Sequence, residues 1–207
     1  MSKSQEIQRR GKQQRGKQTK KQLLQTALNL FSEKGYQNVT VDEIVEKSNS
    51  SKGSFYFHFG SKHSVFMEKF KEIDQYYSDF YRTFPENIPT HDKILLFVGK
   101  QMDYIQYELG KDLMKVIYSN AIMTDENKYF TDQDRPLFKI LGEILVEGQE
   151  KNEIDTSLSV ESLKLIIMQG LMGSIYHWCM ANETYSLRET SEEFFLSLIN
   201  GLRIHGN

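Results

Sequence analysis

Apolar side chains recur at three- and four-residue intervals along most of the chain, which is the spacing of one face of an α-helix. The first such stripe begins at Leu24 and continues at Ala27, Leu28 and Phe31, and Gly35 follows as a helix-ending residue. No segment shows the strict alternation of apolar and polar residues that is typical of a half-buried β-strand. The pattern therefore predicts an all-α protein.

Two short helices separated by a polar turn are predicted after this stripe. Thr40 precedes a run of apolar residues at helical spacing, and Glu43 follows Thr40 by three positions. This is the spacing of a capping box, which predicts that a helix begins here and covers 41–47. After the turn, Ser51 offers a hydroxyl as the N-cap of a second helix over 52–59. We interpret the pair as a helix-turn-helix, an arrangement with which proteins read double-stranded DNA.

The second of these helices is suited to contact something outside the protein. Phe55 and Phe59 lie four residues apart on one face, which must be buried. Small, basic and polar groups occupy the first turn, where the helix N-terminus and a lysine can reach phosphates and short side chains can reach base edges. The residues that we expect to contact DNA are Thr40, Ser51, Lys52, Gly53, Ser54, Tyr56, Phe57, His58 and Lys62.

These residues resemble the DNA-binding signature of the tetracycline-repressor (TetR) family of bacterial transcriptional regulators. The match comprises Thr40-Val41, the run SKGSFYFHF that starts at Ser51, and Ser61-Lys62, after an amphipathic helix that ends FSEKGY. Phe57 replaces a frequent Tyr, which leaves an apolar ring that can meet a thymine methyl group. We expect a preference for particular operator sequences to follow from this exchange.

The resemblance implies a three-helix helix-turn-helix head followed by a C-terminal helical bundle that binds a ligand and dimerises. We therefore expect a basic, flexible arm over 1–18, a DNA-binding domain over 19–65 and a ligand-binding and dimerisation domain over 66–207. The arm lacks a core-forming pattern. It is interpreted as a disordered tail, or as a basic arm that neutralises phosphates or enters the minor groove beside the recognition helix, and both interpretations can hold at once.

Charge divides the chain at the same place. The formal net charge is −2, but the first 62 residues hold 12 Lys/Arg against 5 Asp/Glu, which leaves 14 against 23 for the remainder. Only the N-terminal end suits a polyanion such as DNA. The alternative is that this asymmetry is only solvated surface.

Six further helices are predicted after the helix-turn-helix, with a polar loop over 124–134. Their expected ranges are 62–83, 91–109, 112–123, 135–151, 160–181 and 191–204. The first would span about 33 Å at about 1.5 Å per residue, which is long enough to run from the head into a second domain. It is the natural lever between the two.

The last two predicted helices carry more apolar residues than the outer helices of a monomer need. One alternative is that the helix over 160–181 is a buried central helix within one subunit. Pairing of both helices with a second copy explains their composition together and suits a symmetric reader of two half-sites. The expected interface residues are Leu171, Phe194, Leu198 and Leu202.

The sequence offers little for metal, cofactor or covalent chemistry. Its five histidines show no i, i+4 pair, and its one cysteine, Cys179, excludes an internal disulfide. His177 lies two positions before this thiol, but neighbouring positions on a helix point apart. We expect no metal, no cofactor and no enzymatic activity, and, since no apolar run approaches a membrane span, a cytoplasmic protein.

Aromatic and methionine residues are frequent in the expected second domain, where they could be plain core or could line a pocket for an apolar or aromatic molecule. The candidate lining residues are Tyr77, Tyr104, Tyr118 and Met172. The chain is thus interpreted as a ligand-responsive repressor of a palindromic operator. The alternatives are a helical nucleic-acid or partner-binding module without a ligand response, and a small helical enzyme.

Overall fold

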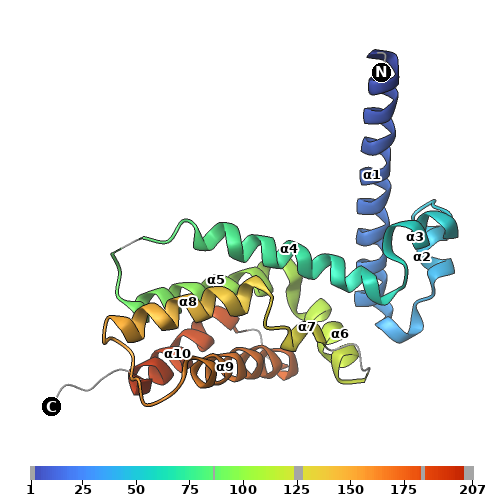
Figure 1. Ribbon diagram of the computed structural model, residues 1–207. Helices are drawn as coiled ribbons and strands as arrows, with labels where there is room; N and C mark the ends of the chain where they lie inside the picture. The colour runs from blue at the N-terminus through green and yellow to red at the C-terminus, as the bar shows by residue number, and fades with distance from the viewer. Residues whose placement is uncertain (1–2, 86, 124–127, 183–184, 203–207) are drawn as a thin grey trace. The chain divides into compact units, whose positions relative to one another are not determined.

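The computed structural model describes residues 3–85, 87–123, 128–182 and 185–202, and these form helices, turns and loops without a β-strand (Figure 1). The chain divides into two compact units, Met1–Lys71 and Glu72–Asn207. This division falls a few residues after the boundary expected at residue 65.

The first unit is a small helical head. Its elements are α1 (Lys3–Lys34), the 3₁₀ turn η1 (Tyr36–Asn38), α2 (Val41–Lys47), α3 (Lys52–Phe59) and the start of α4 (His63–Tyr81). The predicted stripe of α1 is buried against the short helices, with Ala27 and Phe31 fully inaccessible beside Ile44 of α2 and Phe55 of α3. The core of the head therefore fixes the orientation of both short helices.

The N-terminal segment differs from the expected arm. Helix α1 begins at Lys3 and runs without interruption to Lys34, although a helix was predicted only from about residue 19. Residues 3–18 are rich in Lys, Arg and Gln, which have good intrinsic helix propensity, so they can extend a helix that the core has already nucleated. The first helix therefore starts earlier than expected, and the flexibility of the arm stays a prediction.

Local capping sets the ends of the short helices, as predicted. The Thr40 hydroxyl accepts the Glu43 N–H at 3.2 Å, and the Ser51 hydroxyl accepts the Ser54 N–H at 3.1 Å. Asn49 has a φ of 49° in the turn between the helices, a left-handed conformation that Asn tolerates better than most residues. The helix-turn-helix is thus specified largely by residues within a few positions of one another.

Helix α4 is a single element that starts in the first unit and ends in the second. It begins after Ser61, whose hydroxyl accepts the Ser64 N–H at 3.1 Å. Its observed range agrees with the predicted one within two residues at its C-terminal end.

The second unit is a helical bundle. It contains α5 (Thr90–Asp103), the π-helix η2 (Tyr104–Leu109), α6 (Gly110–Met123), α7 (Lys128–Thr131), α8 (Pro136–Glu150), α9 (Val160–Met180) and α10 (Leu187–Leu202). Helix α5 packs against α8 and α10, and α9 packs against α6, α8 and α10 (Figure 1). The shared core includes Ile94, Phe97, Met102, Leu141, Ile144, Ile167 and Phe195.

Three helix boundaries in this unit differ from the prediction. The helix expected over 91–109 changes into a π-helix at Tyr104 and ends where Gly110 adopts a φ of 78°. The expected loop over 124–134 contains α7, while 124–127 lie outside the described residues. Helix α10 starts four residues early, at Leu187, because the Ser186 hydroxyl accepts the Glu189 N–H at 3.3 Å.

Candidate DNA-binding surface and ligand pocket

Helix α3 has one buried face and one exposed face. Phe55 and Phe59 lie in the core of the head, whereas Tyr56 is 52% exposed and Phe57 is 84% exposed. Large exposed aromatic side chains contribute nothing to the core, so their presence on a short surface helix indicates contact with another molecule. The exposed face of α3 is therefore the candidate DNA-binding surface.

The first turn of α3 is small, polar and accessible. A Cβ added at Gly53 would contact only the Ser51 hydroxyl, at 3.8 Å, so packing within the protein does not require glycine there. The ammonium of Lys52 lies 2.6 Å from the Asp42 carboxylate, and both side chains are largely exposed. Such a surface ion pair adds little stability, so Lys52 can exchange Asp42 for a phosphate.

The other predicted contact residues of the head have mixed surroundings. Thr40 and Ser51 are exposed but use their hydroxyls as N-caps, and Ser54 and His58 are half-buried on α3. These four residues and the first turn of α3 belong to the helix-turn-helix of one compact unit.

Lys62 was predicted to contact DNA, but the structure directs its ammonium inwards. The Nζ atom donates to the backbone carbonyls of Tyr36 and Val39 at 2.7 and 2.8 Å and lies 4.1 Å from the centre of the Tyr36 ring. Burial lowers the pKa of Lys62, while the two carbonyls and the ring favour its charged form. We therefore reassign Lys62 to holding the η1 turn.

A small pocket lies in the second unit between α6, α7 and α9. Its volume is about 260 Å³, and its lining is Tyr118, Ala121, Ile122, Phe130, Thr131 and Met172. The Tyr118 hydroxyl donates to the Met172 carbonyl at 3.4 Å, and the Tyr118 ring lies 5.9 Å from that of Phe130. Burial raises the pKa of Tyr118, so its hydroxyl stays neutral and can serve as a hydrogen-bond donor.

Only two of the four predicted lining residues meet in this pocket. Tyr77 is buried in the core with its ring 5.9 Å from Phe97, and Tyr104 lies on η2 with its ring 4.6 Å from Tyr76. Tyr77 and Tyr104 therefore do not line this pocket, and their assignment to a ligand cavity stays a prediction. Helical spacing selects apolar faces, but it does not show which faces leave a gap between them.

Two lining residues were not predicted, although the helical pattern of the sequence could have identified them. Ala121 and Ile122 follow Tyr118 by three and four positions on α6, so they share its face. Phe130 could not have been found in this way because it fell in a segment predicted to be a loop.

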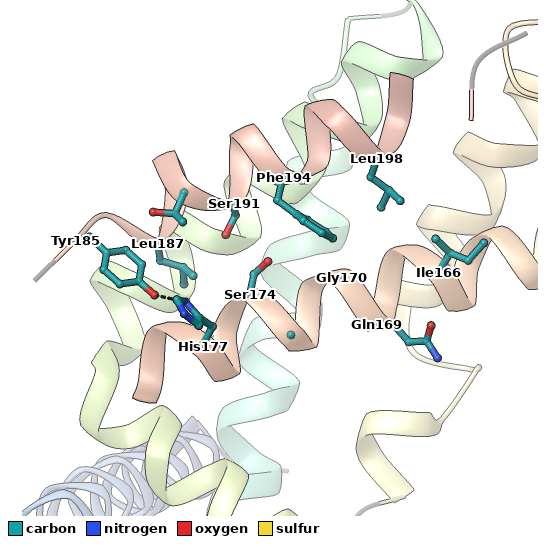
Figure 2. A pocket seen from close by; sticks show the side chains of 12 residues that line it. Ile166, Gln169, Gly170, Ser174, His177, Tyr185, Leu187, Ser191, Phe194 and Leu198 are labelled. Carbon is teal, nitrogen blue, oxygen red and sulfur yellow. Dashed lines mark hydrogen bonds between the residues drawn. The ribbon is translucent and has the colours of Figure 1, made fainter. Parts of the chain in front are cut away.

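A longer apolar groove runs between α9 and α10, with a volume of about 520 Å³ (Figure 2). Phe194 and Leu198 project into it from α10 above Gly170 of α9, and Phe194 is 47% exposed. At one end, the His177 Nδ1 atom lies 2.8 Å from the Tyr185 hydroxyl. This groove carries two of the four residues expected at a dimer interface.

The other two expected interface residues lie elsewhere. Leu171 is only 3% exposed because its side chain belongs to the core of its own subunit, so its assignment to the interface is wrong. Leu202 is half-buried at the end of α10, where its carbonyl accepts the Asp155 N–H at 3.0 Å, and it does not line the groove.

The described residues offer no group of three or more His, Cys, Asp or Glu side chains that could hold a metal ion. Burial raises the pKa of the Cys179 thiol, which disfavours the reactive thiolate. Among the same residues, no helix is long and apolar enough to cross a membrane.

Comparison with known proteins now places the chain. A family model described as "Bacterial regulatory proteins, tetR family" matches residues 23–68, which contain α2 and α3, and a second, described as "YsiA-like protein, C-terminal region", matches 124–201. The chain is a TetR-family transcriptional regulator. The family resemblance and the all-α fold expected from the sequence are both confirmed.

Two curated relatives illustrate how far sequence similarity extends. The fatty acid metabolism regulator protein of Bacillus subtilis is 24% identical over 186 residues, which cover 87% of this chain and 94% of the relative. The biofilm operon icaADBC negative transcriptional regulator IcaR of Staphylococcus epidermidis is 34% identical over 61 residues, only 30% of this chain and 33% of the relative. Both relatives are named as regulators, and IcaR as an HTH-type negative transcriptional regulator.

Solved structures of two regulators share the fold. The fatty acid degradation regulator FadR of Bacillus halodurans matches with a TM-score of 0.73 and 20% identity, covering 90% of this chain and 97% of the other. FadR of Bacillus subtilis, solved in complex with stearoyl-CoA, matches with a TM-score of 0.72 and 21% identity, covering 89% and 98% of the two chains.

Proposed function

We propose that this TetR-family regulator is a homodimeric, cytoplasmic repressor that grips a palindromic operator with α3 and releases it when an acyl-type ligand enters the pocket between α6, α7 and α9. The observation that carries the DNA-binding part is the exposed face of α3. Tyr56 and Phe57 there are solvent-exposed although the opposite face of the same helix is buried.

On DNA, the residues of α3 divide into two groups. Lys52 and the N-capped first turn are suited to phosphates, because a lysine and free backbone N–H groups both favour negative charge. Gly53, Tyr56 and Phe57 are suited to base edges, with the Phe57 ring against a thymine methyl group. A second copy related by two-fold symmetry would place a second α3 on the other half-site.

The basic N-terminal turns of α1 are proposed to add phosphate contacts. Lys12, Arg15 and Lys17 follow one another on exposed positions of a helix that continues into the head. A chain that lacks residues 1–17 should therefore show a flatter dependence of operator affinity on salt concentration. An unchanged slope would assign these residues no part in DNA binding.

The pocket between α6, α7 and α9 favours the apolar part of a ligand. Its lining combines two aromatic rings, a methionine and aliphatic side chains with the hydroxyls of Tyr118 and Thr131. At about 260 Å³ it is slightly smaller than the sites of about 300–1,000 Å³ that enclose whole drug-sized molecules, so it suits one end of an acyl chain. The stearoyl-CoA complex of Bacillus subtilis FadR supports this class of ligand.

A release assay tests the proposal. An operator is first selected from random duplex DNA, and its complex with the protein is then titrated with stearoyl-CoA, free fatty acids, aromatic compounds and small anionic metabolites. We expect long acyl compounds to weaken operator binding by about 1–3 kcal/mol of coupling free energy. Release by small anionic metabolites alone would contradict the proposed ligand class, and no release by any compound would favour a binding module without a ligand response.

Two variants locate the ligand. Ala121→Trp fills the pocket and should abolish the response to stearoyl-CoA while leaving operator affinity measurable. Tyr104→Ala is the matched control, because Tyr104 is an aromatic residue of the same unit that does not line the pocket. Equal effects of the two substitutions would place the ligand elsewhere.

A further inference from the structure

A buried ion pair links α4 to the start of α8. The Arg135 guanidinium grips the Asp74 carboxylate through two nitrogens, with Nη2 to Oδ1 at 2.9 Å and Nε to the two carboxylate oxygens at 3.2 and 3.1 Å. The side chains of Arg135 and Asp74 are only 8% and 16% exposed. This bidentate geometry restrains the position of α4 more strongly than apolar contacts can, because a small shift of α4 would break several directional hydrogen bonds at once.

Helix α7 supplies the third member of this cluster. The Tyr129 ring centre lies 3.5 Å from the guanidinium carbon of Arg135, and the Tyr129 carbonyl accepts a hydrogen bond from Arg135 Nη1 at 3.3 Å. The Tyr129 hydroxyl also hydrogen-bonds the Asp74 carboxylate. Tyr129 therefore touches both partners of the ion pair, and a movement of α7 must disturb it.

The residue that follows Tyr129 faces the proposed ligand pocket. Phe130 and Thr131 line this pocket, and the Phe130 ring lies 5.9 Å from Tyr118 and from the adjacent Tyr129. On α7, Phe130 therefore lines the pocket, while the preceding residue, Tyr129, contacts the ion pair. Since α4 is continuous from Asp74 back to His63, the ion pair acts on the same helix that leaves the DNA-binding head.

We propose that Tyr129, Arg135 and Asp74 form a latch that couples the pocket to α4. A ligand that binds against Phe130 displaces α7 and moves the Tyr129 ring away from the Arg135 guanidinium. The bidentate hydrogen bonds between Arg135 and Asp74 then weaken. As a result, α4 can leave the position in which the protein binds the operator. The inference rests on the proposed function, because it takes the pocket between α6, α7 and α9 as the effector site. It adds which residues transmit the signal.

The latch predicts that breaking it mimics the ligand. Asp74→Asn, Arg135→Lys and Tyr129→Leu should each weaken operator binding of the ligand-free protein about tenfold, a change of about 1.4 kcal/mol. Each should also remove most of the further loss of affinity that stearoyl-CoA causes in the wild type. Arg135→Lys is the most specific test of the three, because lysine keeps the positive charge but lacks the planar guanidinium that makes bidentate hydrogen bonds.

Two controls separate the latch from a general loss of stability. Lys93→Gln breaks a partly buried ion pair of the same unit, Lys93–Glu147 at 2.7 Å, which does not involve α4. Arg82→Gln breaks the exposed Arg82–Asp79 pair at the end of α4. Both variants should keep the wild-type response to stearoyl-CoA, even where thermal unfolding shows that Lys93→Gln is less stable.

A second readout does not need a ligand. Ala121→Trp perturbs the pocket by itself, so its effect on operator affinity should be non-additive with that of Tyr129→Leu if α7 transmits it, and additive if α7 does not. Calorimetry measures directly whether stearoyl-CoA binds to the protein, and an absence of binding would show that the assignment of the effector is wrong. Additive effects, or latch variants with wild-type operator affinity, would overturn the latch whatever the ligand proves to be.

Discussion

Gly170 of α9 lies directly beneath the ring of Phe194 on α10. A Cβ placed on Gly170 would come within 2.7 Å of Phe194 Cε1 and 3.2 Å of Phe195 Cζ. The two helices of the groove can approach this closely only because residue 170 has no side chain.

This contact predicts opposite effects for two substitutions on the same helix. Gly173→Ala meets no atom within 4 Å and should stabilise the protein by about 0.5–1 kcal/mol through helix propensity. Gly170→Ala gains the same propensity, but it must displace the ring of Phe194 and press on the fully buried Phe195, so it should destabilise by about 1–3 kcal/mol in total. Urea denaturation of both variants measures the difference, and equal stabilities would show that the two aromatic rings adapt freely.

The groove between α9 and α10 is predicted to close against a second copy. Phe194→Glu would place an unpaired charge in that interface and should dissociate the dimer while the subunit stays folded. Leu171→Glu places the charge in the core of the subunit and should unfold it. Sedimentation and circular dichroism at micromolar concentration separate the two effects, and a monomeric wild type that binds single half-sites would refute the dimer.

Substitutions on the exposed face of α3 are predicted to weaken or alter operator binding without changing the fold. Lys52→Ala and Tyr56→Ala should each weaken binding by about 1–3 kcal/mol, because each removes a phosphate or base contact. Phe57→Tyr should instead change the preferred base at one position of each half-site. The contrasting variant is Phe55→Ala, which empties a core site and should cost about 3–5 kcal/mol of stability.

The pH dependence of stability should report Glu147. Hydrogen bonds from Lys151 and Lys93 lower the pKa of its carboxyl below the ordinary value of 4.5. Because the folded-state pKa is the lower one, this stabilisation is complete above pH 4.5 and is lost as the pH falls through the folded-state value.

Substitution of Glu147 tests this sign. At pH 7, Glu147→Gln should reduce the free energy of unfolding by about 1–2 kcal/mol, since the largely buried Lys93 loses its charged partner. The difference from the wild type should shrink only as the pH falls through the lowered folded-state pKa of Glu147, where the wild-type carboxyl also loses its charge. Glu150→Gln, on the same helix but exposed, should show neither effect, and a constant difference at every pH would exclude a charge effect.

The sequence alone determined the features of this protein that depend on near neighbours in the chain. Thr40 and Ser51 cap their helices with N–H groups three residues away, so capping rules located α2 and α3 at their observed bounds. The four-residue spacing of Phe55 and Phe59 identified the buried face of α3, and hence the exposed face that carries Tyr56 and Phe57. The same residues carry the resemblance to the TetR family.

The tertiary structure decided whatever depends on contacts between distant segments. Lys62 binds carbonyls more than 20 positions earlier in the chain, and Arg135 grips a carboxylate 61 positions away. Helical periodicity states that Leu171, Met172, Tyr77 and Tyr118 lie on helices, but it cannot state which neighbour covers each face. Burial of Leu171, the gap between Tyr118 and Met172, and the path from α7 to Asp74 arise only when the helices pack, because packing depends on the shapes of all the surfaces that meet.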